Sequence, residues 1–456
     1  MQNGNNNKSN NNSLQDNLSS SQMNINEDSV ENRSNWHSCN NRRHNHSRKV
    51  ENVIVLQGGG SLGAFACGAF KAMVKEGIKI DIASGTSVGA INAAIIAGSK
   101  SDQPERDLEE FWIELAESSY SIVPDFFFFD YDQDAGMISF KRMSSAGINS
   151  ALFGVPNMFV PRWLGGGVES GFKDIIGQNG SALMPSRWTY LYDHSPLGKT
   201  LEKYLDFSKL DSNQSVKRKS STSVYNARLI ITCVNVLNAE PIVFDSAKMR
   251  IQTKHLLAST AYPVYGFPWV KIEDGTYAWD GSLLDNTPVR QVLTASPRND
   301  KCIYIVENYP RKIDSLPSDL MEVVDRTRDI IFSDKTKSSL RLAKFITRQI
   351  NLIEELYDVF EASEHSKFDP QKIRFIKEEY DSIVNNHGAE ILEVSRIARE
   401  RISTPHLLKN ADFSPKQIRE LIEQGERKTR DHLKKKKKKK LANRAKKRDN
   451  FDVKSS

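Results

Sequence analysis

The sequence predicts a three-layer α/β fold with a mostly parallel central sheet, followed by a helical C-terminal extension. Three observations lead to this prediction. A short apolar run, Val53–Leu56, ends in three glycines and is followed by a helical pattern. A second strand-like run, Ile78–Ala83, leads through another glycine-rich turn into a second helix. From about Asp319 onward the pattern is helical over long stretches.

Composition divides the 456 residues into four expected regions. Residues 1–50 are rich in Asn, Ser and Gln, and they contain too few apolar side chains to offset the entropy of ordering, so disorder is expected. The main domain is expected over residues 51–310, with an aromatic and glycine-rich insertion at about 121–190. A mainly helical extension follows over 311–432, and 433–456 form a lysine-rich tail that should be disordered.

The second glycine-rich turn, Gly85-Thr86-Ser87-Val88-Gly89, has the pattern of a nucleophile elbow. It opens directly into the small-residue helix Ala90–Ala97, which places Ser87 at a corner between strand and helix. A serine at such a corner can also be an ordinary helix N-cap. The glycine loop one strand earlier favours the nucleophile, because it brings amide donors and a hydroxyl to adjacent turns of one sheet edge.

Gly58, Gly60 and Gly63 also match the G-x-G-x-x-G pattern of dinucleotide-binding domains, with Asp81 as the acidic residue about twenty positions on. Both sites aim backbone N–H groups at negative charge. The Ser87 elbow and a later Asp-Gly pair at Asp280 favour a hydrolase, and a dinucleotide-dependent oxidoreductase is the alternative.

Local patterns predict the other elements of the main domain. A helix is expected over Pro104–Ser118 and another over Ile251–Thr260. Two hairpins are expected, the second around the turn Asp274-Gly275, and Lys301–Glu307 should be a buried strand. The hairpin strands are Arg228–Val236 with Glu240–Phe244, and Val270–Glu273 with Thr276–Trp279.

The C-terminal extension shows three helical signals. One apolar stripe consists of Leu320, Val323, Val324, Thr327, Ile330 and Ile331. A second long pattern covers Ser339–Glu361. The capping box Ser414-Pro415-Lys416-Gln417 marks the start of the last helix.

Three motifs together resemble the patatin-like phospholipase family. They are the loop Gly58-Gly59-Gly60-Ser61-Leu62-Gly63, the elbow Gly85-Thr86-Ser87-Val88-Gly89, and Asp280-Gly281-Ser282. The resemblance implies the patatin-like hydrolase fold and a Ser-Asp dyad in which Asp280 accepts the Ser87 proton. It also implies that the amides of Gly58, Gly59 and Gly60 form the oxyanion hole, with Gly63, Gly85, Gly89 and Gly281 as supporting motif residues. Two departures stand out: Ser61-Leu62 where many members have a basic residue before the last loop glycine, and Ser282 in place of the usual second glycine.

The segments Leu191–Leu197, Leu201–Phe207 and Phe159–Arg162 resemble a bacterial and archaeal subgroup that has a helical C-terminal extension. Two interpretations of the aromatic insertion follow. Its aromatic side chains either fill a small core of their own or form a lid or acyl-binding surface over the serine.

The implied activity is hydrolysis of lipid acyl esters through an acyl-Ser87 intermediate, with a catalytically silent lipid-binding scaffold as a further alternative. No cofactor and no metal are expected, because no His, Cys or carboxylate cluster has ligand spacing. Cys39, Cys67, Cys233 and Cys302 are expected to be free thiols. None of His365, His387, His406 and His432 has the surroundings of a catalytic base.

Positive charge is concentrated near the C-terminus, where residues 426–456 carry 15 basic and 4 acidic residues. The lysines Lys434–Lys440 are a solvated run, a nucleic-acid contact or an anchor to anionic lipid. The anchor is the most economical choice for a lipid hydrolase, and no nucleic acid is expected as partner. Because no signal-peptide or membrane-spanning pattern is present, the protein is expected in the cytoplasm, with peripheral membrane contact; no oligomeric state follows.

Overall fold

The structure is a computed structural model, and it describes residues 49–119, 145–164, 188–212, 227–296, 299–363, 368–387, 390–400 and 408–452. Nearly all of the segment 1–50 lies outside the described residues, as does Cys39. Residues 120–144 and 165–187, which include most of the aromatic insertion, also lie outside them. The expectations for these segments therefore stay predictions.

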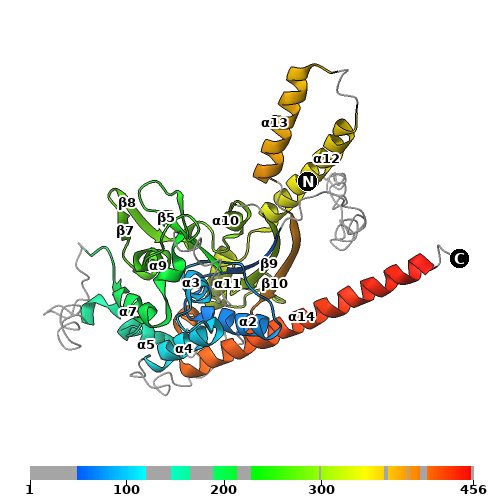
Figure 1. The fold of residues 1–456 in the computed structure, drawn as a ribbon. Coiled ribbons are helices and arrows are strands. Elements are labelled where there is room, and N and C mark those ends of the chain that lie inside the picture. Colours follow the sequence, from blue (N-terminus) through cyan, green and yellow to red (C-terminus); the bar gives the residue numbers. More distant parts are fainter. Residues whose placement is uncertain are drawn as a thin grey trace, which may run out of the picture. The chain divides into compact units, whose positions relative to one another are not determined.

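A central eight-stranded sheet organises the described chain (Figure 1). Its strand order is β10-β9-β1-β2-β5-β8-β7, and β6 also pairs with β5. The four pairs from β10 to β5 are parallel, whereas β6, β7 and β8 pair antiparallel. The strands are β1 (Val50–Leu56), β2 (Ile82–Thr86), β5 (Arg228–Asn235), β6 (Pro241–Asp245), β7 (Val270–Glu273), β8 (Thr276–Asp280), β9 (Asp300–Glu307) and β10 (Ile391–Ala398), with β3 (Val160–Pro161) and β4 (Tyr192–Asp193) in a small separate sheet.

Helices connect and cover these strands. The α-helices are α2 (Ala64–Lys75), α3 (Val88–Gly98), α4 (Pro104–Glu117), α5 (Ser145–Phe153), α7 (Ser195–Tyr204), α9 (Thr253–Thr260), α10 (Val289–Leu293), α11 (Leu320–Phe332), α12 (Lys337–Glu361), α13 (Pro370–His387) and α14 (Pro415–Asp452). Short 3₁₀ turns include η1 (Gly60–Gly63), η4 (Arg162–Leu164), η5 (Phe207–Leu210), η7 (Pro263–Tyr265), η8 (Gly281–Leu283) and η10 (Lys409–Ala411). No helix in the described parts of the chain is both long and apolar enough to span a bilayer.

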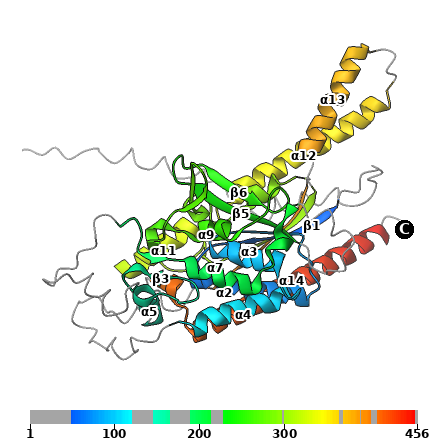
Figure 2. The same cartoon turned by 60° about the vertical axis from the view of Figure 1, so that its left-hand side comes forward.

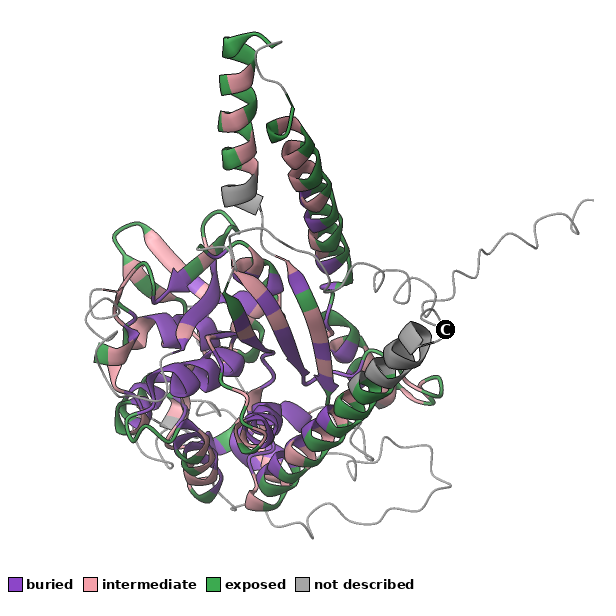
Figure 3. Ribbon diagram, turned by 45° about the vertical axis from the view of Figure 1, so that its right-hand side comes forward, coloured by how far each residue is buried: buried purple, intermediate pink, exposed green. Residues whose placement is uncertain are grey.

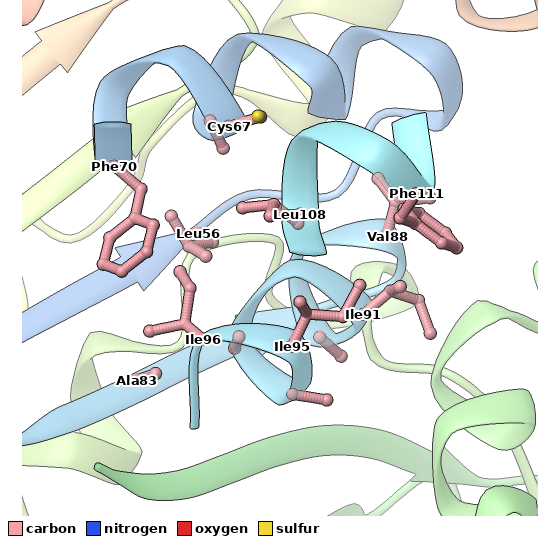
Figure 4. Packing of buried hydrophobic residues seen from close by; sticks show 14 of the residues in the cluster. Leu56, Cys67, Phe70, Ala83, Val88, Ile91, Ile95, Ile96, Leu108 and Phe111 are labelled. Atoms are coloured by element: carbon pink, nitrogen blue, oxygen red, sulfur yellow. The ribbon is translucent and has the colours of Figure 1, made fainter. Parts of the chain in front are cut away.

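Strand β1 has buried side chains on both faces, as its unbroken apolar run predicts. Ile54 and Leu56 join the larger core with α2, α3, α4, α9 and α14. Figure 4 shows Leu56 packed among side chains of α2, α3 and α4. Val53 and Val55 join a smaller core on the other face with α10 and α12. The sheet is therefore enclosed by helices on both faces, which gives the predicted three-layer α/β fold (Figure 2).

Most local predictions are confirmed. Helices α4 and α9 and both hairpins form where the patterns predict them. Helix α14 begins at Pro415, and the Ser414 Oγ accepts a hydrogen bond from the Gln417 N–H at 3.3 Å. The second strand is the exception: it begins at Ile82, four residues later than predicted, because pairing with β1 starts where Ile82 lies opposite Val53.

The C-terminal extension is part of the sheet, which the helical pattern does not predict. Strand β10 pairs in parallel with β9 and forms the edge of the sheet.

The expectation of disorder from residue 433 also differs from the structure, since α14 continues to Asp452 through the lysines. Contacts with acidic side chains offset part of the repulsion: Lys436 pairs with Glu393 at 2.8 Å, and Lys437 pairs with Glu76 at 2.5 Å.

Candidate active site

Ser87 lies at a sharp turn between β2 and α3. Its φ of 57° is in the left-handed region, which a residue with a side chain rarely adopts. A Cβ on Gly89 would lie 2.2 Å from the Leu56 carbonyl oxygen, so α3 can pack this closely against β1 only with glycine there. The Ser87 side chain makes no capping hydrogen bond, which removes the N-cap interpretation. The turn has the geometry of the predicted nucleophile elbow.

The register of the sheet brings Asp280 to the same edge as Ser87. Asp280 is the last residue of β8 and pairs with Cys233 of β5. The residue before Cys233 is Thr232, which pairs with Thr86 of β2. Strand β5 lies between β2 and β8, so Ser87 and Asp280 lie on either side of Cys233. Their backbones are separated by roughly two strand spacings of about 4.8 Å each.

The Asp280 carboxyl is fully buried, and its two oxygens differ. Oδ1 accepts hydrogen bonds from the Ser282 N–H at 2.8 Å and from the Ser282 Oγ at 2.5 Å. Oδ2 receives no well-formed hydrogen bond from the described residues, although the Ser87 hydroxyl lies close enough to lower the pKa of the carboxyl. Burial is the largest influence, and it raises the pKa of Asp280 from 3.8 to about 6 against the lowering by Ser282 and Ser87. The carboxyl can therefore be ionised at neutral pH and still accept a proton.

The glycine loop lies directly against the serine. A Cβ on Gly58 would meet the Ser87 Cβ at 2.7 Å, so only glycine allows this approach. The Gly58 N–H donates to Asn286 Oδ1 at 3.0 Å, which corrects the expectation that it serves the oxyanion hole. The N–H groups of Gly59 and Gly60 donate to no residue that the structure describes, and both glycines line the cavity described below. Of the three N–H groups expected in the oxyanion hole, those of Gly59 and Gly60 thus remain available to bind an oxyanion.

The other motif glycines lie where the patterns predict them. Gly85 is the fourth residue of β2, and Gly281 begins η8 directly after Asp280. Gly63 ends η1, where its carbonyl accepts a hydrogen bond from Asn92 Nδ2 at 2.9 Å. The glycine loop, the Ser87 elbow and Asp280 all line one cavity.

A buried amide network, which the motifs do not predict, holds the glycine loop. Asn308 follows β9 directly, and its Nδ2 donates to the carbonyls of Gln57 and Gly58 at 3.0 and 3.1 Å. Gln57 Oε1 accepts the Asn308 N–H at 2.8 Å, and Gln57 Nε2 donates to Thr287 Oγ1 at 2.8 Å. The sequence position of these residues could have indicated the network. Gln57 and Asn308 are polar residues that directly follow two buried strands, and these strands lie side by side.

A cavity of about 300 Å³ opens over the serine. Ser87, Asp280, Gly59 and Gly60 line it together with mainly apolar side chains, among them Met158, Phe159, Leu191, Leu197, Phe267 and Phe332. Met158 and Phe159 belong to the described part of the aromatic insertion, and both are also part of the larger core. These two side chains therefore pack into the larger core and not into a core of the insertion's own, and they also form part of the cavity wall.

Among the described residues, His194 is the histidine that lines this cavity, and it is not one of His365, His387, His406 and His432. His194 is buried, its Nε2 lies 3.0 Å from the Leu257 carbonyl oxygen, and burial lowers its pKa. His432 lies on α14, and burial lowers its pKa too. His365 and His406 lie outside the described residues. Of the described histidines, only His194 lines the cavity.

Cys67 and Cys233 are buried and carry free thiols, as predicted, and Cys302 is half-buried. Among the residues that the structure describes, no group of three His, Cys, Asp or Glu side chains has the arrangement of a metal site.

Comparisons with known proteins give distant structural matches and one family match. The chain is similar to VipD from Legionella pneumophila, at 14% identity and a TM-score of 0.32, over 84% of this chain and 67% of VipD. It is similar to the type III effector ExoU, at 13% identity and a TM-score of 0.30, over 84% of this chain and 52% of ExoU. A second ExoU structure, from Pseudomonas aeruginosa with SpcU, matches at 16% identity and a TM-score of 0.26, over 62% of this chain and 49% of that one. The chain thus spans about half the length of the ExoU chains, and no curated protein matches it.

The family match covers the whole site. The model of the patatin-like phospholipases matches residues 54–293, slightly more than half of the chain, and this range includes the glycine loop, Ser87 and Asp280. The chain therefore belongs to the patatin-like phospholipase family, a family of lipid acyl hydrolases.

Proposed function

We propose that the protein hydrolyses acyl esters of lipids, phospholipids among them, through an acyl-Ser87 intermediate. One observation carries the proposal: Ser87, Asp280 and the amide-bearing Gly59 and Gly60 line one mainly apolar cavity. Apolar walls suit an acyl chain, and the few polar groups converge where an ester carbonyl would lie.

In the proposed first step, Asp280 takes the Ser87 hydroxyl proton while Oγ attacks the ester carbonyl carbon. The oxyanion that forms accepts hydrogen bonds from the Gly59 and Gly60 N–H groups. The protonated Asp280 then returns the proton to the leaving alcohol, which gives acyl-Ser87. A water molecule repeats the sequence with Asp280 as base, and the products are a fatty acid and the free serine.

The position of Asp81 weakens the dinucleotide alternative. This carboxylate precedes β2, where it accepts a hydrogen bond from the Asn52 N–H at 2.9 Å and pairs with Lys49 at 3.4 Å. The glycine loop follows β1, which runs parallel to β2, so Asp81 and the loop lie at opposite ends of the strands. A dinucleotide site needs both at the same end, because the carboxylate binds the ribose next to the pyrophosphate.

A fluorophosphonate probe tests the proposal against both alternatives. We expect covalent labelling of the wild-type protein and none of Ser87→Ala, because the probe needs an activated serine. Equal labelling of both proteins would remove Ser87 as nucleophile. No labelling of either, with lipid still bound, would favour the silent scaffold, and measurable NADH binding would favour the oxidoreductase.

The pH dependence of kcat/KM should show an acid limb with an apparent pKa of about 6. Asp280 must be ionised to act as base, so activity is present above this pH and is lost as pH falls through it. Ser282→Gly removes the Oγ–H donor that stabilises the carboxylate, so the limb should move to higher pH by on the order of one unit. Ser282→Thr keeps a hydroxyl and is the control. An acid limb that stays in place in Ser282→Gly would count against Asp280 as the titrating base.

We also propose that the lysines of α14 contact an anionic membrane. Lys434, Lys435, Lys438 and Lys439 are exposed, whereas Lys436 and Lys437 are engaged by acidic side chains. Replacing the four exposed lysines by glutamine should lower sedimentation with anionic vesicles and leave hydrolysis of a short-chain ester unchanged. The loss should be largest at low salt, because exposed charges are screened beyond about 8 Å at physiological salt. Unchanged sedimentation would remove the lysine anchor.

A further inference from the structure

Helix α11 has its apolar face outward and its charged face inward. Leu320, Val323, Val324, Ile330 and Ile331 share one face and are each 43–64% exposed; we call them the outer face. On the opposite side, Asp325 and Asp329 are 2% and 1% exposed. This reverses the usual arrangement of a surface helix, in which the apolar stripe faces the core.

The buried charges explain the orientation of α11. Lys409 of η10 lies 2.8 Å from Asp325 Oδ1 and 2.7 Å from Asp329 Oδ1, and Arg328 lies 2.6 Å from Asp325 Oδ1. These ion pairs require the acidic side of α11 to face the body of the protein. The apolar side is therefore held toward solvent by specific contacts, and such a continuous exposed patch is typical of a binding surface.

The helix that carries the outer face also lines the catalytic cavity. Arg328 and Phe332, on the inner side of α11, line that cavity. Phe332 packs on Tyr262 with ring centroids 5.6 Å apart, and its carbonyl accepts a hydrogen bond from Asn286 Nδ2 at 3.0 Å. Val264, two residues after Tyr262, is 74% exposed and lines the cavity, and Leu284, two residues before Asn286, is 53% exposed. Exposed apolar side chains therefore also lie on the two turns that carry the contacts of Phe332.

Basic side chains border this apolar surface. A shallow depression after α11 is lined by Lys335, Lys337, Arg341 and the apolar Leu342 and Phe345. The first half of α12 adds Lys344 and Arg348 and contains no acidic residue before Glu354. Apolar residues with a basic border match the surface of an anionic bilayer, in which acyl chains lie beneath negatively charged head groups.

We propose that the outer face of α11 docks on the surface of an anionic phospholipid bilayer and sets the catalytic cavity against the membrane. The proposal rests on the proposed function, because a lipid ester must leave the bilayer to reach Ser87. It differs from the lysine anchor, since the outer face acts through apolar contact and belongs to a helix that lines the catalytic cavity.

Vesicle sedimentation of the full chain tests the docking surface, with Ser87→Ala as background so that no lipid is consumed. The probe is phosphatidylcholine vesicles with and without phosphatidylserine. Leu320→Ser/Val324→Ser/Ile331→Ser should lower the partition coefficient by about tenfold or more, because three apolar side chains lose their contact with the bilayer. Lys335→Gln/Arg341→Gln should lower binding only to vesicles that contain phosphatidylserine.

A control is Leu237→Ser/Val243→Ser, which removes two apolar side chains that are 70% and 42% exposed from the β5–β6 turn and from β6, and this variant should bind like the background protein. With Ser87 intact, the triple-serine protein should hydrolyse a short-chain ester at the wild-type rate, which shows that it is folded. If the triple-serine protein sediments like the background, the proposal is overturned. It is also overturned if the chain dimerises through this face and the substitutions abolish the dimer but not vesicle binding. Absence of ester hydrolysis in the wild type would remove the proposed function and leave the binding result standing.

Discussion

Ser87→Ala and Asp280→Asn are each expected to abolish acyl-enzyme formation, and the double variant should be no slower than either single variant. The first change removes the nucleophile, and the second removes the proton acceptor while keeping the size of the side chain. Each should lower kcat by on the order of 10⁴-fold or more, because residues that act as one unit lose their whole contribution together. A residual rate should remain in all three, since the Gly59 and Gly60 amides do not depend on the base. Single-turnover kinetics with a chromogenic ester measure the rate of acyl-enzyme formation in each variant.

Two controls make the result specific. Asp285→Asn changes a half-buried aspartate five residues further on that does not line the cavity, and its rate should stay within a few-fold of wild type. His194→Phe removes the described histidine of the cavity wall, and acyl-enzyme formation should persist. If His194→Phe instead costs on the order of a thousandfold, as a lost general base does, the base is a histidine. If Asp280→Asn is nearly silent, the assignment of Asp280 fails even where that of Ser87 stands.

The parts of the site that could be predicted are those whose signal is local. The Ser87 elbow needs glycine at Gly89 because α3 packs against the β1 carbonyl at Leu56, and that requirement is visible as a five-residue motif. The same holds for Asp280, where a hairpin strand ends in an Asp-Gly pair. In both cases the backbone geometry allows only certain residue types, so the geometry can be inferred from the sequence.

The parts that could not be predicted depend on contacts between residues far apart in the chain. Strand β10 is a short segment of mixed apolar and polar residues within a helical region, and pairing with the edge of β9 makes it part of the sheet. The N–H of Gly58 is taken by Asn286, a partner 228 residues away. The outward apolar face of α11 is set by Lys409, which lies about eighty residues beyond the helix. Periodicity indicates that α11 is a helix, but it does not say which face is buried.

The same lysine leads to the second large expected effect. Lys409→Met should lower the free energy of unfolding by about 3–5 kcal/mol, because it leaves Asp325 and Asp329 buried with less compensating charge. The change should also lower kcat by up to on the order of a hundredfold, since small displacements of a positioned loop are costly. The link is structural: the Lys409 carbonyl accepts a hydrogen bond from Ser61 Oγ at 3.0 Å, and a Cβ on Gly60 would lie 2.2 Å from the Asn410 carbonyl oxygen. Urea unfolding and ester kinetics give the two measurements.

Two further variants separate the buried charge from the loss of side-chain packing. Lys416→Met replaces an exposed lysine on α14 and should change neither quantity. Lys409→Met/Asp329→Asn also neutralises one of the two carboxylates that lose their pairing with Lys409, while Asp325 keeps its pair with Arg328 at 2.6 Å. The double variant should therefore regain part of the lost stability, because a neutral side chain tolerates burial better than an unpaired charge. If Lys409→Met unfolds at the same urea concentration as wild type, the ion pairs do not hold α11 in place. In that case the glycine loop is supported by the backbone contacts of residues 408–413 and by the amide network of Gln57 and Asn308.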